Sequence, residues 1–497
     1  MTYFSKSSLL LAMCLAGCTT GDQYRQQVAP LEAPLHYGQR DFAGSGSRQV
    51  VATGATFPAQ AVTEDPWWES FWDLRLNRLV DQALRVNSDL ASAGFALRKA
   101  RLSVGLASND LLPQPSADLS GNASRRLDSS DNTTHQYGST NSLSWEIDLW
   151  GRLRAARDAK RWAAEASAQD LQYTALSLVA DVCRDYWTLA YLNQSISAGE
   201  ENLTELSRIV ELVSVQRQAG QVSLLELREA QQNLESELAA QSALVQQREE
   251  TRNAIAALLD GQSLPLNDEP QTLSDAQMLT VEEGLPAELL GRRPDLRAAE
   301  LRLRESLIEV DVTARSYYPR LSLTGSMESG GTSLGSVLSN PVATLGAGLS
   351  LPFLNLGQMK FNTEIAGTTY LQSASQFRTT LYEALKEVQD SLSARDQYAL
   401  QIGAKARSFD AAVDVERMYE VRYRTGASTL RTWLDARRTL RNSELALAQA
   451  RRDLLINDVS LMLALGGSLS VNLGVTSRSS LSEDAEKIAH LPSVSHQ

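Results

Sequence analysis

The chain has 497 residues and a formal net charge of −12, with 43% hydrophobic and 21% charged residues. These proportions are ordinary for a folded protein, so they exclude a chain that is disordered along its whole length. The acidic balance, without any block of basic residues, excludes a typical nucleic-acid-binding protein. The four histidines include no pair at the spacing of metal ligands, so we expect no metal, no cofactor and no enzymatic activity.

The first element in chain order is an export signal. Lys6 precedes an apolar run over residues 9–16, which is too short to span a bilayer because about 20 residues are needed. Residues 15–18 (LAGC) are similar to the lipobox of bacterial lipoproteins, and Thr19 follows them. That similarity implies cleavage of the preceding signal, acylation of Cys18 and sorting to the outer membrane. An ordinary secretory signal is the alternative.

Two tandem repeats make up most of the chain. When the sequence is shifted by 206 positions, several punctuating residues coincide without a gap. The coinciding landmarks are Asp89 with Asp295, Pro113 with Pro319, Gly151 with Gly357 and Gly220 with Gly426. This register divides the chain into six segments. They are a lipoprotein signal peptide at 1–17, an N-terminal segment at 18–66, repeat one at 67–261, a linker at 262–272, repeat two at 273–467 and a polar tail at 468–497.

Repeat one begins with a helix and a β-hairpin. Helical periodicity runs over 74–112 and stops at Pro113. Two runs rich in Ser, Thr and Gly follow at about 114–128 and 137–150, with a cluster of polar turn-forming residues between them. Apolar and polar residues alternate over 143–149, which predicts a strand with one apolar face. A hairpin is therefore expected at about 114–150.

A long helix and a shorter one complete the repeat. The stretch 152–219 lacks proline and keeps apolar residues at heptad spacing, which predicts one helix of 68 residues. Gly220 ends this helix, and a second helix over 222–259 must then fold back beside it. Cys183 lies among apolar residues of the long helix, so we expect it as a small core residue.

The element lengths predict the architecture. Repeat two shows the same order, with helices over 287–317, 358–425 and 428–465 and a hairpin at about 319–355. At 1.5 Å per residue a helix of 68 residues is about 102 Å long, and two shorter helices stacked end to end would match it. Four strands per chain are too few for a membrane barrel, whereas three chains give twelve strands and room for a lumen. We expect a homotrimer, with an edge hairpin of a soluble α+β protein as the alternative.

Several sequence segments carry a family resemblance. They are residues 67–71 (WWESF), 146–151 (EIDLWG), 291–297 (GRRPDLR), 423–426 (YRTG) and 434–436 (LDA). Together they resemble the outer membrane factor family, the TolC-like trimeric exit ducts, and most closely its outer membrane efflux lipoprotein branch (OprM/NodT-type). The resemblance covers nearly all of the mature chain. It implies a membrane α+β fold, in which a homotrimeric 12-stranded outer-membrane β-barrel is continuous with a long periplasmic α-helical barrel.

The resemblance also implies a function. A member of this family is the outer membrane channel of a tripartite efflux system and passes drugs or other small toxic compounds to the exterior. The implied partners are a periplasmic adaptor protein, a proton-driven inner-membrane pump and the lipid of the cell outer membrane. Within the same fold, an exit duct for type I protein secretion is the alternative. A trimeric coiled-coil structural stalk is the alternative from a different class.

The expected periplasmic gate lies where the helices converge, at the hairpin tips. Arg431, Asp435 and Arg438 are spaced by four and three residues, so they share one helical face. Three copies would give rings of charge around the axis, and the resemblance implies that they form the closed aperture. The family often has an apolar residue in place of Arg431, which favours closure by ion pairs here. Arg424 is expected to tie neighbouring hairpins together, and Glu229 is the repeat-one counterpart of Asp435. Solvated surface ion pairs are the alternative.

The same tips are expected to meet the adaptor end on, because small residues allow helices to approach closely. The candidate contacts are Gly220, Ser223, Leu224, Gly426, Ser428 and Leu430. A plain turn between two helices is the alternative at each of these positions.

Overall fold

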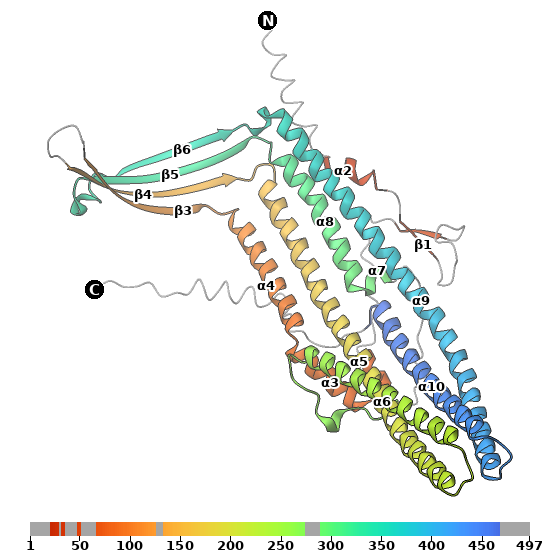
Figure 1. The fold of residues 1–497 in the computed structure, drawn as a ribbon. Coiled ribbons are helices and arrows are strands. Elements are labelled where there is room, and N and C mark those ends of the chain that lie inside the picture. Colours follow the sequence, from red (N-terminus) through yellow and green to blue (C-terminus); the bar gives the residue numbers. More distant parts are fainter. Residues whose placement is uncertain are drawn as a thin grey trace.

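The computed structural model describes residues 20–28, 31–34, 47–50, 66–125, 133–273 and 289–467. The predicted signal peptide, Cys18 and the polar tail lie outside these described residues. Long helices form the body of the molecule, and a curved sheet extends from one end of them (Figure 1). None of the described helices contains an apolar stretch long enough to cross a membrane.

Two long helices frame the molecule. α5 (Arg152–Gln218) and α9 (Leu356–Arg424) have 67 and 69 residues, and each is therefore about 100 Å long. α8 (Pro294–Arg315) packs between them at the end nearer the sheet (Figure 1). α6 (Leu224–Leu258) and α10 (Leu430–Ala464) fold back along them at the opposite end. Shorter helices thus stack along the long ones, as the length arithmetic predicts.

The prediction of one helix over 74–112 is wrong, because the structure divides this stretch into two helices. α3 (Leu74–Val86) ends and α4 (Ser88–Asn109) begins at Asn87, whose side chain accepts a hydrogen bond from the N–H of Leu90 at 2.9 Å. Asparagine is a strong N-cap and a poor residue for a helix interior. Helical periodicity on both sides of such a residue does not reveal the break.

The prediction of one helix over 287–317 is wrong in the same way. α7 (Leu289–Arg292) precedes α8, and Arg293 between them has an extended backbone. Pro294 opens α8, since proline lacks an N–H and suits the first helical turn. The remaining small elements are α2 (Thr20–Arg25), β1 (Leu31–Pro34), β2 (Ser47–Val50), η1 (Trp67–Phe71), η2 (Leu266–Asp268), η4 (Leu334–Ser336) and η5 (Pro352–Leu354).

One antiparallel sheet combines strands of both repeats. β3 (Gln114–Arg125) pairs with β4 (Thr133–Ile147), and β5 (Arg320–Gly331) pairs with β6 (Val342–Ser350). β4 also pairs with β5, so the order is β3-β4-β5-β6 and the two predicted hairpins lie side by side (Figure 1). Within the described chain, β3 and β6 are the edges of this sheet.

The first face of the sheet carries mainly apolar and small side chains. Because side chains alternate along a strand, directly paired residues of neighbouring strands share a face. One row of this apolar face consists of Pro115, Leu143, Gly325 and Leu345. Leu345 is 92% exposed in the single chain, and Leu119 is 83% exposed. This face therefore presents hydrophobic side chains that the chain itself does not cover.

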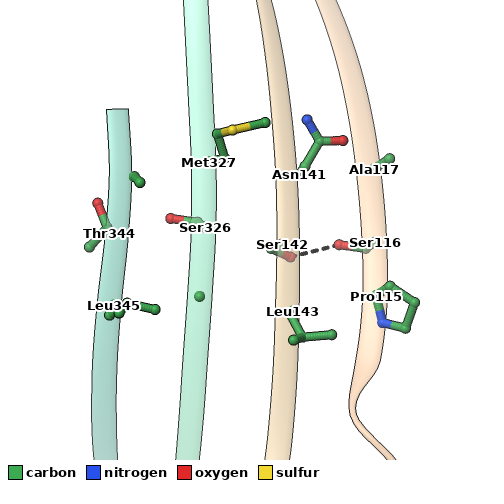
Figure 2. A pocket seen from close by; sticks show the side chains of 12 residues that line it. Pro115, Ser116, Ala117, Asn141, Ser142, Leu143, Ser326, Met327, Thr344 and Leu345 are labelled. Atoms are coloured by element: carbon green, nitrogen blue, oxygen red, sulfur yellow. Dashed lines mark hydrogen bonds between the residues drawn. The ribbon is translucent and has the colours of Figure 1, made fainter. Parts of the chain in front are cut away.

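The second face of the sheet is polar. Serine, threonine and glycine dominate it, and the hydroxyl groups of Ser116 and Ser142 form a hydrogen bond of 2.7 Å across β3 and β4 (Figure 2). The pairing register places Asp118 opposite Thr140 and Thr140 opposite Glu328. The two carboxylates thus lie in one row across the sheet.

Three apolar clusters hold the helices together. A middle core contains Trp68, Tyr186 and Trp187, and the fully buried Cys183 lies in it as expected. A second core joins α8, α9 and α10. The tip core joins the two hairpins and consists of Leu206, Ile209, Val213, Leu227, Ala230, Leu430, Trp433 and Leu434.

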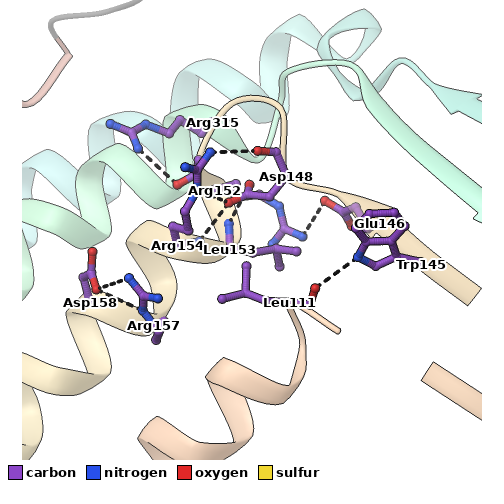
Figure 3. Close-up of polar contacts among 11 residues, drawn as sticks. Leu111, Trp145, Glu146, Asp148, Arg152, Leu153, Arg154, Arg157, Asp158 and Arg315 are labelled. Carbon is purple, nitrogen blue, oxygen red and sulfur yellow. Dashed lines mark hydrogen bonds and ion pairs between the residues drawn. The ribbon is translucent and has the colours of Figure 1, made fainter. Parts of the chain in front are cut away.

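A polar network fixes the sheet to α5 (Figure 3). Asp148 accepts hydrogen bonds from the N–H groups of Leu153 and Arg154 at 3.1 and 3.0 Å, which satisfies two donors of the first helical turn. Glu146 forms an ion pair of 2.8 Å with Arg152. The segment between β4 and α5 therefore sets the direction in which the long helix leaves the sheet.

Candidate functional site

The first hairpin turn joins α5 to α6. Gly220 has a φ of +71°, a left-handed conformation that glycine adopts without strain. The N–H of Gln221 donates to the carbonyl of Gln216 at 2.8 Å, which satisfies an acceptor at the end of α5. Ser223 and Glu226 form a capping box at the start of α6. The local hydrogen bonds therefore hold this turn in one conformation.

The second hairpin turn repeats this design with different caps. Gly426 has a φ of +76°, and the N–H of Ala427 donates to the carbonyl of Arg422 at 2.7 Å. Thr429 caps α10 by accepting a hydrogen bond from the N–H of Thr432 at 3.3 Å. The helix thus begins two residues later than the predicted boundary at 428.

The predicted adaptor contacts differ in exposure. Gly220, Ser223, Leu224 and Gly426 are exposed, and Ser428 is half-buried. Leu430 is only 1% exposed, because it packs in the tip core between the two hairpins. Its place in the core corrects the expectation of a surface residue, so the exposed candidates are those of the turns themselves.

The predicted gate residues share the exposed face of α10. Arg431, Asp435 and Arg438 are all exposed, while Trp433 on the opposite side of the helix is buried. Arg438 donates to the side-chain oxygen of Asn233 on α6 at 2.8 Å. Among the described residues of this chain, Asp435 forms no ion pair with either arginine. The charge rings and intersubunit pairs therefore stay a prediction about the assembled form.

Two further predicted gate residues lie near the same tips. Arg424 is exposed and forms an ion pair of 2.6 Å with Glu420, one turn earlier on α9. Glu229 lies on α6, where its carbonyl accepts a hydrogen bond from the side chain of Asn233 at 2.9 Å. Asn233 thus contacts both Glu229 and Arg438.

An aromatic pair within the second hairpin makes a hydrogen bond to the first hairpin. Tyr423 and Trp433 stack with their ring centroids 5.3 Å apart. The hydroxyl of Tyr423 donates to Gln216 of the first hairpin at 2.9 Å, and the indole of Trp433 donates to Glu416 at 3.0 Å. Burial and the carboxylate of Glu226 raise the pKa of Tyr423, which keeps this hydroxyl protonated as a donor.

Arg437 adds a charged contact to this seam, and sequence reasoning missed it. Its guanidinium pairs with Glu416 at 3.3 Å and donates to Asn202 of α5 at 3.1 Å. Arg437 is only half-buried and follows Ala436, which is buried in the same helix. Arg437 follows the apolar residues Trp433, Leu434 and Ala436 on the same helix, and this was the available signal that it lies at the edge of a packed face.

The side chains at the hairpin tips make contacts within each hairpin and between the two hairpins. Over the described part of the chain, no group of three or more histidine, cysteine, aspartate or glutamate side chains is placed to hold a metal ion. The tips instead combine rigid turns, a shared apolar core and polar contacts between the two hairpins. Such a junction can hold two hairpins together or let them separate.

The chain matches a known protein family. The model of a family described as outer membrane efflux protein matches residues 79–261 and 285–467. One matched range falls in each predicted repeat, which confirms that the fold consists of two tandem repeats. The boundaries predicted for the six segments stay a prediction.

Individual relatives agree with this match. The chain is 27% identical to the toxin and drug export protein A of Aggregatibacter actinomycetemcomitans over 93% of this chain and 98% of that protein. It is 28% identical to the probable efflux pump outer membrane protein TtgC of Pseudomonas putida over 94% of this chain and 96% of that protein. The solved outer-membrane channel OprN superposes with a TM-score of 0.73 and 28% identity, covering 84% of this chain and 97% of that chain.

Proposed function

The chain belongs to the outer membrane efflux protein family, and from this membership we propose how it works. The protein is an outer membrane channel that serves as the exit duct of an efflux system and extends into the periplasm through its helices. In our proposal three copies form the duct, since three four-stranded sheets supply the twelve strands of a barrel with a lumen. The observation that carries the proposal is a two-faced sheet continuous with helices of about 100 Å.

The names of two relatives support a proposal for the cargo, and the family resemblance of the sequence supports one for the partners. One relative is named for the export of toxin and drug, and another for an efflux pump. From these names we assign drugs or other small toxic compounds as the cargo. From the family resemblance we assign a periplasmic adaptor as the protein at the tips and a proton-driven pump as the energy source. The protein has no enzymatic role in this proposal. Type I protein secretion is the second candidate, because toxin appears in the first of these names.

The gate is the part of the proposal that conductance can test. Asp435→Ala removes the acidic ring and leaves Arg431 and Arg438 of three copies facing one another, so like charges repel and favour dilation. We expect the purified trimer to conduct poorly in planar bilayers and Asp435→Ala to conduct better at low salt. High salt should reduce this difference, because the Debye length is about 8 Å at 0.15 M. Equal conductance of the two proteins at low salt would place the gate elsewhere.

The lipid anchor is tested separately. Cys18→Ser should abolish incorporation of labelled palmitate, because the acylated thiol and its cleavage site are lost. The sheet should still insert into the outer membrane, since a lipid anchor adds only a second attachment. Labelling that survives the substitution would show that Cys18 is not the acylated residue, and a wild type without label would indicate an ordinary secretory signal.

A further inference from the structure

The apolar packing of α5 is interrupted between the middle core and the tip core. Along this helix the middle core ends at Leu192 and the tip core begins at Leu206. The buried positions between them are Asn193, Ser195, Ile196 and Gly199, and of these Ile196 alone brings an apolar side chain. Polar contacts therefore contribute to the joining of the two hairpins at this level.

A single buried arginine makes the connection. Arg441 of α10 is 6% exposed, and its Nη2 donates to the carbonyl oxygen of Ser195 on α5 at 2.8 Å. Its Nε lies 3.3 Å from the carboxylate of Glu237 on α6, and its Nη1 lies 3.0 Å from Glu444 on its own helix. The planar guanidinium can serve all three acceptors at once, which an ammonium group cannot do with the same geometry.

Gly199 makes room for this contact. A Cβ atom at this position would lie 2.0 Å from Oε1 of Gln241 and 3.0 Å from Nη2 of Arg441. Gln241 of α6 uses the same space, and its Nε2 donates to the carbonyl of Ile196 at 2.9 Å. We call Gly199, Gln241, Arg441, Ser195 and Glu237 the polar joint.

The polar joint breaks the symmetry of the two repeats. At the shift of 206 residues, Gly199 corresponds to Lys405, Gln241 to Leu447 and Arg441 to Glu235. Lys405 donates to the carbonyl of Ala446 and so makes a different contact. The packing of a long helix against its hairpin partner therefore does not require such a joint. It serves the contact between the hairpins of repeat one and repeat two.

We propose that Arg441 is a positioning residue of the periplasmic gate, which locks α10 to the α5–α6 hairpin in the closed duct. Beyond the joint, the repeat-two side donates to the repeat-one side through Tyr423, Arg437 and Arg438. A tilt of one hairpin against the other would have to break the contacts of Arg441 with Ser195 and Glu237. Gly199 gives α5 its most pliable point at this level, since glycine is the poorest helix former apart from proline.

This inference rests on the proposed function and is tested with the full-length trimer in planar bilayers. Arg441→Met keeps an unbranched apolar stem and removes every donor. We expect its channels to open about tenfold more often than those of the wild type, because a lost charge-assisted hydrogen bond corresponds to about a factor of ten. Arg441→Lys should lie between the two. The matched control is Arg417→Met, which removes an exposed arginine that pairs with Asp414 on its own helix, and it should conduct like the wild type.

A second variant distinguishes a specific effect on channel opening from a general loss of stability. Gly199→Ala favours the helical state of α5 but pushes the side chains of Gln241 and Arg441 away from its backbone. A lock predicts more frequent opening of trimers that stay folded and assembled at the temperature of the recording. If Arg441→Met does not assemble, Gly199→Ala and Arg441→Lys decide the question.

The possible failures can be told apart. Intact trimers of Arg441→Met and Gly199→Ala that open no more often than the wild type, while Asp435→Ala opens, would overturn the lock and leave the duct in place. If neither the wild type nor any variant conducts ions, the proposed duct itself fails. Native mass measurement of each variant shows that trimers are being compared.

Discussion

Losing a partner of a buried charge in the helices should lower the free energy of unfolding more than losing an exposed ion pair. Arg293 is 4% exposed and binds both oxygens of Asp295 at 2.7 and 3.0 Å, Glu387 at 2.7 Å and the carbonyl of Ala464 at 3.1 Å. It thereby ties the start of α8 to α9 and to the end of α10. Removing one partner of such a buried pair leaves an uncompensated charge, whereas exposed pairs contribute about 0–1 kcal/mol.

Asp458 on α10 leads to a prediction about pH. Its side chain is 1% exposed and lies 3.4 Å from Arg395, and burial raises its pKa to about 6 in spite of that arginine. The folded state therefore binds the proton more tightly than the unfolded chain, whose pKa is near 3.8. The stabilisation is complete below about pH 4 and is lost as the pH rises through 6, with a size of about 3 kcal/mol. Asp458→Asn should remove this contribution to the pH dependence.

Thermal unfolding followed by circular dichroism at acidic and neutral pH checks this expectation. The melting temperature of the wild type should fall more between the two conditions than that of Asp458→Asn. Burial also raises the pKa of Asp185 to about 6, so only the difference between the proteins isolates Asp458. Asp390→Asn makes the same substitution at an exposed position of α9 and should behave like the wild type. Parallel curves for all three proteins would contradict the prediction.

At the scale of elements, the polar face of the sheet predicts ion selectivity. Asp118 and Glu328 lie in one row on either side of Thr140, and both side chains are exposed in the single chain. In the proposed trimer this row would give six carboxylates at one level of the lumen. Replacing both by amides should lower the preference for cations by roughly twofold to tenfold at low salt.

The reversal potential in a potassium chloride gradient measures this preference. The double variant Asp118→Asn with Glu328→Gln should shift the potential toward zero, and high salt should shrink the shift. Asp268→Asn, which changes a half-buried carboxylate paired with Arg78 away from the sheet, is the control. A double variant that is as selective as the wild type would show that this row does not face the permeation path.

Some of these elements can be predicted from the sequence, and others cannot. The hairpins and the long helices follow from alternation, heptad spacing and the positions of proline and glycine, which are local signals. The break at Asn87 does not, because a cap acts through one side chain that periodicity ignores. The contact of Arg441 with Ser195 joins residues that lie 246 positions apart, so only the folded chain brings them together. The site was therefore predictable at its turns but not at the seam between its hairpins.

At the scale of the whole molecule, the helices near the sheet form a layer with two open edges. α4, α5, α8 and α9 lie side by side in that order, so among these four helices α4 and α9 are at the two edges (Figure 1). The edge of α4 carries Phe95, Leu102 and Leu106, which are 63–69% exposed. The edge of α9 carries Phe361 and Ile365, each 63% exposed. Two such apolar strips on opposite edges fit a head-to-tail ring, in which α9 of one copy covers α4 of the next.

This arrangement predicts that Phe361→Asp disrupts the trimer. Burying a phenylalanine side chain contributes about 2–3 kcal/mol, and each of the three interfaces of the ring would lose it and gain a charge to desolvate. Native mass measurement in mild detergent should show trimers for the wild type and mainly single chains for the variant. Leu338→Asp is the control, because Leu338 is 79% exposed but lies in the connection between β5 and β6, outside both strips. A Phe361→Asp trimer as stable as the wild type would mean that α9 does not face a neighbouring copy.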